Sequence, residues 1–214
     1  MILAALALGL SLTAAAESRR PPVVVALGDS TTAGTPAFLS PLEAPPEGRG
    51  DPKSQYAYWL RRARPKYEVL NRGVNGERAD QIRARFARDV EAVRPRAVIV
   101  LAGVNDVYQG RALEDAEADL RWMYRRAKEL GIVPVAATVL PFDRATAEQD
   151  ARLAALNAWI RAAAKAEKIP FCDAAAAVAD PKDPSRLKGS PDGLHPDVAG
   201  YRALGEALAK ELKP

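Results

Sequence analysis

The chain has 214 residues, of which 48% are hydrophobic, and this is enough to bury the core of one domain. Its 31 basic and 27 acidic residues are spread along the chain and leave a formal net charge of +4, which does not indicate a nucleic-acid partner. Cys172 is the single cysteine, so an intramolecular disulfide is excluded and stability must come from packing.

The first sixteen residues carry no charged side chain and end in Ala-x-Ala at positions 14–16, which is typical of a signal-peptidase site. We therefore expect residues 1–16 to be a signal peptide, residues 17–214 to form a single domain, and the protein to be periplasmic or secreted. Because no Lys or Arg precedes the apolar stretch, the first helix of a soluble protein and a misassigned start remain alternatives. The stretch is shorter than the about 20 residues of a membrane span, so we expect no stable membrane insertion.

Apolar runs at five places predict β-strands, namely residues 23–27, 67–73, 97–102, 132–140 and 168–173. Four of these runs are continuous rather than alternating, which is typical of strands that are covered on both faces. Apolar residues at helical spacing lie between or beside these runs, at residues 56–63, 82–93, 113–130, 153–160 and 198–212.

Alternating strands and helices indicate right-handed β-α-β crossovers. The predicted fold class is therefore α/β, a three-layer α/β/α sandwich with a five-stranded, mainly parallel sheet. Residues 33–52 and 174–191 break the alternation and are irregular in composition. Ligands of open α/β sheets bind outside the carboxyl ends of the strands, where long loops are usually functional.

Ser30 follows the first strand directly, in the stretch VVVALGDST. A sharp turn there would present its hydroxyl at the mouth of the sheet as a nucleophile. Asp-Ser-Thr after a strand is also an ordinary start of a helix, where these side chains cap free N–H groups. A third interpretation is a hydroxyl-rich loop that holds a phosphate, as in flavin-binding proteins of flavodoxin type.

His195, the only histidine, lies three residues after Asp192 in SPDGLHPDVAGY, just before the last predicted helix. One turn would place the carboxylate against the ring, the arrangement that orients a general base and stabilises its protonated form. A serine hydroxyl needs such a base to become a good nucleophile. Alternatively, the histidine is incidental and Asp192 only forms a turn.

Two further loops supply candidate donors for a developing negative charge. Gly73 in NRGVNG offers an unobstructed backbone N–H, and Asn105 in AGVNDV offers a side-chain amide. The alternatives are a turn glycine and an Asx turn, with Asp106 as another cap. All these loops follow elements whose ends meet at one edge of the sheet.

In these motifs the sequence resembles the GDSL, or SGNH, hydrolase family over almost the whole chain after residue 16. The family's four blocks are matched at Gly28-Asp29-Ser30, at Gly73, at Gly103-Val104-Asn105-Asp106 and at Asp192-Gly193-Leu194-His195. The resemblance implies Ser30 as nucleophile, His195 as general base and Asp192 as the residue that orients it. It also implies an oxyanion hole formed by the N–H groups of Ser30 and Gly73 and the amide of Asn105. Thr31 replaces the leucine of the family name, which affects none of these roles.

The expected function is that of a serine esterase that uses no cofactor and no metal, and that cleaves short to medium acyl esters or thioesters through an acyl-enzyme. Similar chains of the family resemble lysophospholipases or acyl-thioesterases, and others remove acetyl groups from carbohydrates, which is the alternative. Phe38, Leu39 and Leu42 either line the acyl pocket or anchor their loop. A flavin-binding protein and an inactive carbohydrate-binding module are alternatives of other classes.

Overall fold

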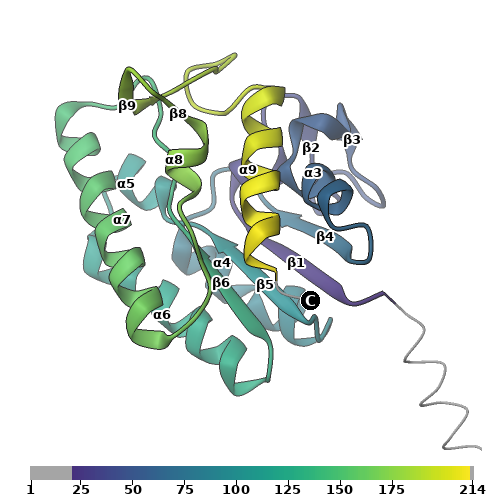
Figure 1. Cartoon of the computed structure of the whole chain (residues 1–214). Helices are drawn as coiled ribbons and strands as arrows, with labels where there is room; N and C mark the ends of the chain where they lie inside the picture. Colours follow the sequence, from purple (N-terminus) through teal and green to yellow (C-terminus); the bar gives the residue numbers. More distant parts are fainter. Residues whose placement is uncertain (1–20, 213–214) are drawn as a thin grey trace, which may run out of the picture.

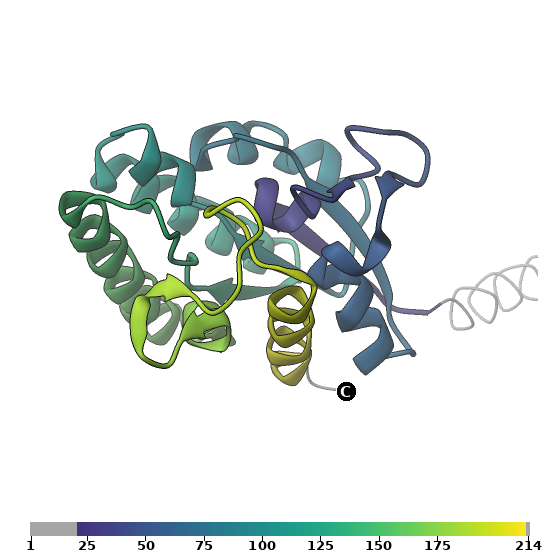
Figure 2. The ribbon, with the colours of Figure 1, turned by 90° about the horizontal axis from the view of Figure 1, so that it is seen from above.

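The computed structural model describes residues 21–212, so the expected signal peptide lies outside the described residues. Helices cover both faces of a central sheet, which is seen face-on in Figure 1 and from above, between its two helical layers, in Figure 2. Five strands form this sheet in the order β4-β1-β5-β6-β7. They are β1 (Val23–Gly28), β4 (Glu68–Gly73), β5 (Ala97–Leu101), β6 (Val133–Ala137) and β7 (Phe171–Cys172).

All pairs in the sheet are parallel, and the central strands are buried, which explains their continuous apolar sequences. Residue pairs Gly28–Gly73 and Gly28–Leu101 lie in register, so three strands end at the same level. The loops that carry the candidate residues therefore begin side by side.

Two apolar cores fill the space between sheet and helices. One core lies under α3 (Tyr56–Ala63), α8 (Ala174–Val178) and α9 (Val198–Glu211), and α9 crosses the front of the sheet in Figure 1. The other lies under α4 (Ala79–Ala84), η2 (Ala87–Glu91), α6 (Leu113–Glu129) and α7 (Ala147–Glu167). The predicted three-layer α/β/α sandwich is confirmed, and its main sheet is entirely parallel.

Shorter elements complete the irregular segments. They are α2 (Ser30–Ala33), β2 (Phe38–Leu39), β3 (Arg49–Gly50), η1 (Pro52–Ser54), α5 (Val104–Tyr108), β8 (Ala179–Asp180) and β9 (Asp183–Leu187). The strands β2 and β3 form a two-stranded antiparallel ladder, as do β8 and β9. In the described part of the chain, no helix combines the length and the apolar character that a membrane crossing requires.

Candidate active site

Ser30 is the first residue of the short helix α2, immediately beyond β1. The cap of this helix is Asp29, whose Oδ1 accepts the N–H of Thr31 at 3.0 Å. Capping is thus done by the residue before Ser30, and the serine hydroxyl is left for another partner. Because Gly28 ends β1 where a Cβ would lie 2.2 Å from the Leu101 carbonyl oxygen, a side chain has no room there and the turn stays tight.

His195 is that partner, although 165 positions separate the two residues. Its Nε2 lies 2.9 Å from Ser30 Oγ, and its Nδ1 lies 2.7 Å from Asp192 Oδ2. The other carboxylate oxygen, Asp192 Oδ1, accepts the N–H groups of Leu194 at 2.9 Å and of His195 at 2.8 Å. The backbone N–H groups of the turn therefore hold the Asp192 carboxylate in place, and this carboxylate orients the imidazole of His195.

The electrostatics of this turn keep Asp192 charged. Partial burial of the carboxyl favours its neutral form, but the hydrogen bonds from the His195 ring and from two backbone N–H groups outweigh burial and hold the pKa of Asp192 below its ordinary value. Ser190 supports the same turn, because its hydroxyl donates to the His195 carbonyl at 2.7 Å and accepts the Gly193 N–H at 2.9 Å. An ionised carboxylate is thus available to stabilise a protonated imidazole.

Asn105 lies in the first turn of α5, at the carboxyl end of β5. One hydrogen of its Nδ2 is donated to the Glu77 carbonyl at 3.0 Å, and the side chain lines the same cavity as Ser30 and His195. An amide nitrogen carries two hydrogens, so the second is available to a ligand. Asp106, in contrast, is fully buried and accepts the N–H of Ala79 at the start of α4.

Gly73 does not take the position predicted for it. Its N–H already donates to Asn71 Oδ1 at 2.9 Å, its carbonyl accepts the Ser40 hydroxyl at 2.6 Å, and it does not line the cavity of Ser30. A Cβ at this position would lie 2.1 Å from the Ala33 backbone nitrogen, so Gly73 allows α2 to pack directly on β4. The structure does not support the predicted role of Gly73 as an oxyanion donor, because the Asn71 side chain already accepts its N–H and thereby holds the turn.

Gly76, three residues further along the same NRGVNG loop, lies where Gly73 was expected. It lines the cavity together with Ser30, Asn105 and His195. Its φ of 74° is in the left-handed region that favours glycine, and open space surrounds its Cβ position. The neighbouring Asn75 is held by Glu43 Oε1, which accepts its backbone N–H at 2.9 Å and its side-chain amide at 2.6 Å.

The cavity at Ser30 is small, about 200 Å³ in volume. Besides Ser30, Gly76, Asn105 and His195, its lining includes Asn75, Val104, Tyr108, Phe142 and Leu194. Tyr108 is 55% exposed and contacts Phe142 edge to face, with 5.9 Å between the ring centroids. The walls are therefore mostly apolar, and an exposed aromatic ring belongs to them.

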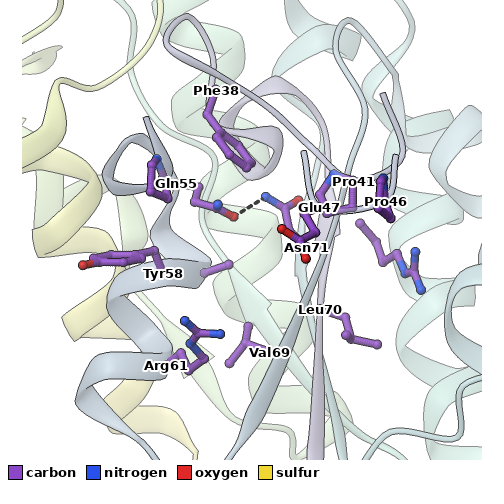
Figure 3. Close-up of a pocket in the computed structure, with 13 residues that line it drawn as sticks. Phe38, Pro41, Pro46, Glu47, Gln55, Tyr58, Arg61, Val69, Leu70 and Asn71 are labelled. Carbon is purple, nitrogen blue, oxygen red and sulfur yellow. Dashed lines mark hydrogen bonds between the residues drawn. The ribbon is translucent and has the colours of Figure 1, made fainter. Parts of the chain in front are cut away.

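A larger cavity of about 570 Å³ lies away from this site, along the edge strand β4 and between α3 and the loop before η1 (Figure 3). None of the candidate catalytic residues lines it. Phe38 lines this second cavity, is buried, and does not line the first. Leu39 and Leu42 are not part of the lining of either cavity. For this loop the structure thus favours the anchoring role over the acyl-pocket role.

Asp29 is the most strongly perturbed carboxyl near Ser30. It is 1% exposed, and burial raises its pKa from 3.8 to about 7, although the Thr31 N–H and the charge of Arg85 act in the opposite direction.

The residues that the structure describes contain no group of three or more His, Cys, Asp or Glu side chains placed to hold a metal ion.

Several residues of the site were not predicted from the sequence. Gly76 and Asn75 lie in the NRGVNG loop that was singled out, but nothing in the sequence distinguishes the two glycines of this loop. Tyr108 lies at the end of α5 and Phe142 in the segment after β6, and a single aromatic residue in either place carries no signal of its own. Only the assembled sheet edge brings them to Ser30.

Comparison with known proteins gives a consistent result. A model of the GDSL-like lipase/acylhydrolase family matches residues 26–203. An acetylxylan esterase of Geobacillus stearothermophilus is 28% identical over 162 residues, 67% of this chain and 71% of that protein. An uncharacterised lipoprotein of Bacillus subtilis, YqeF, is 29% identical over 140 residues, 62% of this chain and 54% of that protein.

Solved structures agree with this result. A lipolytic protein of the G-D-S-L family from Desulfitobacterium hafniense superposes with a TM-score of 0.74 at 27% identity, covering 89% of this chain and 99% of that one. The acetylxylan esterase Axe2 of Geobacillus stearothermophilus superposes with a TM-score of 0.71 at 24% identity, covering 89% of this chain and 93% of that one, a likeness of fold.

Proposed function

Because the chain belongs to the GDSL-like lipase/acylhydrolase family and is a carboxylic ester hydrolase, we propose that it cleaves esters of short acyl chains with Ser30 as its nucleophile. The observation that carries the proposal is the alignment of Ser30 Oγ, the His195 ring and Asp192 through contacts of 2.9 and 2.7 Å. Membership of a hydrolase family also argues against the flavin-binding alternative. The contacts among Ser30, His195 and Asp192 argue against an inactive relative that only binds carbohydrate.

The reaction begins when Ser30 Oγ attacks the ester carbonyl and His195 Nε2 accepts the hydroxyl proton. The carboxylate of Asp192 holds Nδ1 protonated and stabilises the imidazolium that forms. His195 then gives the proton to the leaving alcohol, and an acyl-enzyme remains on Ser30. Water, activated by the same imidazole, hydrolyses this acyl-enzyme and restores the serine.

The negative charge that develops on the carbonyl oxygen is stabilised by three donors. They are the N–H of Ser30 at the start of α2, the N–H of Gly76 and the second amide hydrogen of Asn105. Gly76 takes the role for which Gly73 was predicted, because the Gly73 N–H is held by Asn71. The two backbone N–H groups are fixed by the fold, and the Asn105 amide is held by the Glu77 carbonyl, so these donors need no reorganisation during the reaction. Each donor of this kind is worth about 3 to 4 kcal/mol of transition-state stabilisation.

The size and walls of the cavity favour small acyl groups. Its volume of about 200 Å³ is below the roughly 300–1,000 Å³ of pockets that enclose a drug-sized ligand. Val104, Phe142 and Leu194 supply apolar contact to a short acyl chain. The substrate is therefore a small-molecule ester or thioester with a short acyl group, and chains of palmitate length exceed the cavity.

The test is a series of p-nitrophenyl esters from acetate to palmitate, with the native protein and with Ser30→Ala. We expect the highest kcat/KM for the shortest esters, and a loss of at least about 10⁴-fold in the variant. Hydrolysis that survives unchanged in Ser30→Ala removes Ser30 from the mechanism. An optimum at long chains with an inactive variant keeps the nucleophile and overturns the acyl-chain assignment.

A second candidate within the same chemistry is the removal of acetyl groups from carbohydrates. Two observations favour it: the similarity to a protein named acetylxylan esterase, and the exposed Tyr108 ring in the cavity wall, a surface on which a sugar ring can stack. Acetate release from acetylated xylo-oligosaccharides, compared with release from p-nitrophenyl acetate, distinguishes the two. A Tyr108→Ala variant that loses activity only toward the carbohydrate supports this candidate.

Export is part of the proposal as well. Residues 1–16 have the composition of a signal peptide, and one similar protein is named a lipoprotein. Expression of the full chain in a bacterial host, followed by fractionation and N-terminal sequencing, tests it. A mature protein that begins at Glu17 supports export, and an uncleaved cytoplasmic chain contradicts it.

A further inference from the structure

Arg85 lies beneath the active site; it is the residue directly after α4 and two positions before the start of the π-helical η2. Its side chain is only 8% exposed, although neither the family match nor the mechanism gives it a role. A buried guanidinium is costly unless its donors are paired, and its planar fork of five N–H groups suits it to several acceptors at once. The identity of these acceptors therefore indicates what the residue holds together.

Two of the acceptors are backbone carbonyls at the ends of neighbouring strands. Nη2 donates to the Gly28 carbonyl at 2.8 Å, and Nη1 donates to the Arg72 carbonyl at 2.9 Å. Gly28 lies two residues before the nucleophile Ser30, and Arg72 lies four residues before Gly76. One guanidinium thus joins the strand that leads to the nucleophile with the strand that leads to the oxyanion loop.

A third acceptor belongs to the oxyanion loop itself. Nε donates to Glu77 Oε2 at 2.6 Å, while the backbone carbonyl of the same Glu77 accepts Asn105 Nδ2 at 3.0 Å. Glu77 also follows Gly76 directly. Arg85 therefore reaches both remaining oxyanion donors through one residue. Its fourth acceptor is Asp89 Oδ2 at 2.6 Å, a buried carboxylate of η2 that neutralises the guanidinium.

We propose that Arg85 is a positioning residue that fixes the distance between the nucleophile and the oxyanion donors. It touches no substrate; it holds Gly28, Arg72 and Glu77 to one rigid plane, so that Ser30, Gly76 and Asn105 cannot move independently. This inference rests on the proposed roles of those three residues. A displacement of reacting groups by roughly 1 Å lowers the rate by up to about 10²-fold. Contacts that keep Ser30 and the oxyanion donors at a fixed distance therefore raise the rate.

The test is Arg85→Lys, which keeps the charge but offers too few donors, in the wrong geometry, for all four acceptors. We expect kcat per active site to fall by about tenfold or more while KM stays within about twofold, because the groups that bind the substrate are untouched. Active sites are counted by the endpoint of a p-nitrophenyl phosphonate reaction. Dividing the measured rate by this number excludes any unfolded fraction of the protein from kcat.

A second readout separates positioning from simple support of the fold. A boronic acid that mimics the oxyanion should lose affinity in parallel with kcat/KM, whereas inhibition by the product acetate should change little. The matched control is Arg88→Lys, since Arg88 also pairs with Asp89 but its side chain is 65% exposed and reaches neither strand nor loop. Its kcat should equal that of the native protein.

Glu77→Ala is the second variant, and it decides the question if Arg85→Lys does not fold. It removes only the link to the oxyanion loop and leaves the two strand carbonyls bound, so kcat should again fall while KM stays constant; Glu77→Gln, which keeps an acceptor oxygen, should restore most of the rate. Normal kcat per active site in Arg85→Lys, or in Glu77→Ala where only that variant folds, overturns the proposal. Activity retained in Ser30→Ala would instead refute the underlying mechanism.

Discussion

Asp192 and His195 are joined twice, once through the ring and once through the backbone. Oδ2 of the carboxylate lies 2.7 Å from Nδ1 of the imidazole, and Oδ1 accepts the His195 backbone N–H at 2.8 Å. The two oxygens thus have separate tasks. One shapes the turn, and the other sets the orientation and tautomer of the ring.

Asp192→Asn separates these tasks. The amide oxygen can replace Oδ1 and keep the turn, but the NH₂ group then faces Nδ1 and forces the neutral ring to carry its proton on Nε2, toward Ser30. A protonated Nε2 cannot accept the serine proton, so kcat should fall by about 10⁴-fold with little loss of folding stability. Steady-state kinetics and thermal melting check this. A variant with more than a tenth of the native kcat would contradict the proposed role of Asp192.

Asn105→Ala tests the oxyanion hole. The loss of one donor of this kind typically lowers kcat by about 10²- to 10³-fold, with a small change in KM because the interaction forms mainly in the transition state. Asn105→Asp has nearly the same size but places a negative charge beside the oxyanion, so it should be slower still. If Asn105 only held the Glu77 carbonyl, both variants would lose thermal stability and retain kcat.

The fold follows from the sequence where apolar runs are long and continuous. The strands β1 and β5 are buried on both faces, and their runs predicted the observed bounds within one residue. The helix predicted over residues 82–93 is instead divided into α4 and the π-helical η2, with Arg85 at the division. The spacing of apolar residues cannot detect a change from α-helical to π-helical hydrogen bonding. The contacts of Arg85 were also not predictable, because the carbonyls that accept its hydrogen bonds belong to two strands distant in sequence.

The site was predictable as residue types and not as geometry. Ser30 and Asp192 each lie within hydrogen-bond distance of the His195 ring, as predicted, and their catalytic roles are part of the proposal. The sequence did not indicate whether Gly73 or Gly76 supplies the oxyanion N–H, because both are glycines of the same loop. The structure distinguishes them through Asn71, whose side-chain oxygen accepts the Gly73 N–H. This contact depends on the folded conformation of the loop and is not visible in the sequence.

Leu194→Ala tests which loop sets the acyl preference. Leu194 is half-buried and lines the cavity of Ser30, so its truncation enlarges the acyl pocket. We expect the ratio of kcat/KM for p-nitrophenyl hexanoate to that for the acetate to rise several-fold. The matched control is Leu39→Ala, because Leu39 is also half-buried but lines neither cavity, and its ratio should not change. A shift in Leu39→Ala alone would restore the first loop as the acyl-binding wall.

Asp29→Asn tests the buried carboxyl beside the nucleophile. The pKa of Asp29 is about 7 in the folded protein, against an ordinary value of 3.8 when the chain unfolds. Between these values the folded state holds a proton that the unfolded state has released, so the free energy of unfolding decreases as pH rises from about 4 to 7. The total over the three pKa units is roughly 4 kcal/mol. Asparagine resembles the protonated acid at every pH and can keep the Thr31 cap.

The stability of Asp29→Asn relative to the native protein should therefore increase with pH, by up to about 4 kcal/mol between pH 4 and pH 8, as measured by urea unfolding at several pH values. Asp183→Asn is the control. Hydrogen bonds from Ser185 lower the pKa of the exposed Asp183 below its ordinary value of 3.8, so the stability that its charge contributes is fully present above about pH 4 and is lost only on further acidification. The stability of this variant relative to the native protein should therefore stay constant between pH 4 and pH 8. A pH-independent difference for Asp29→Asn would mean that the Asp29 carboxyl is ionised throughout, with Arg85 as the nearby charge that compensates it.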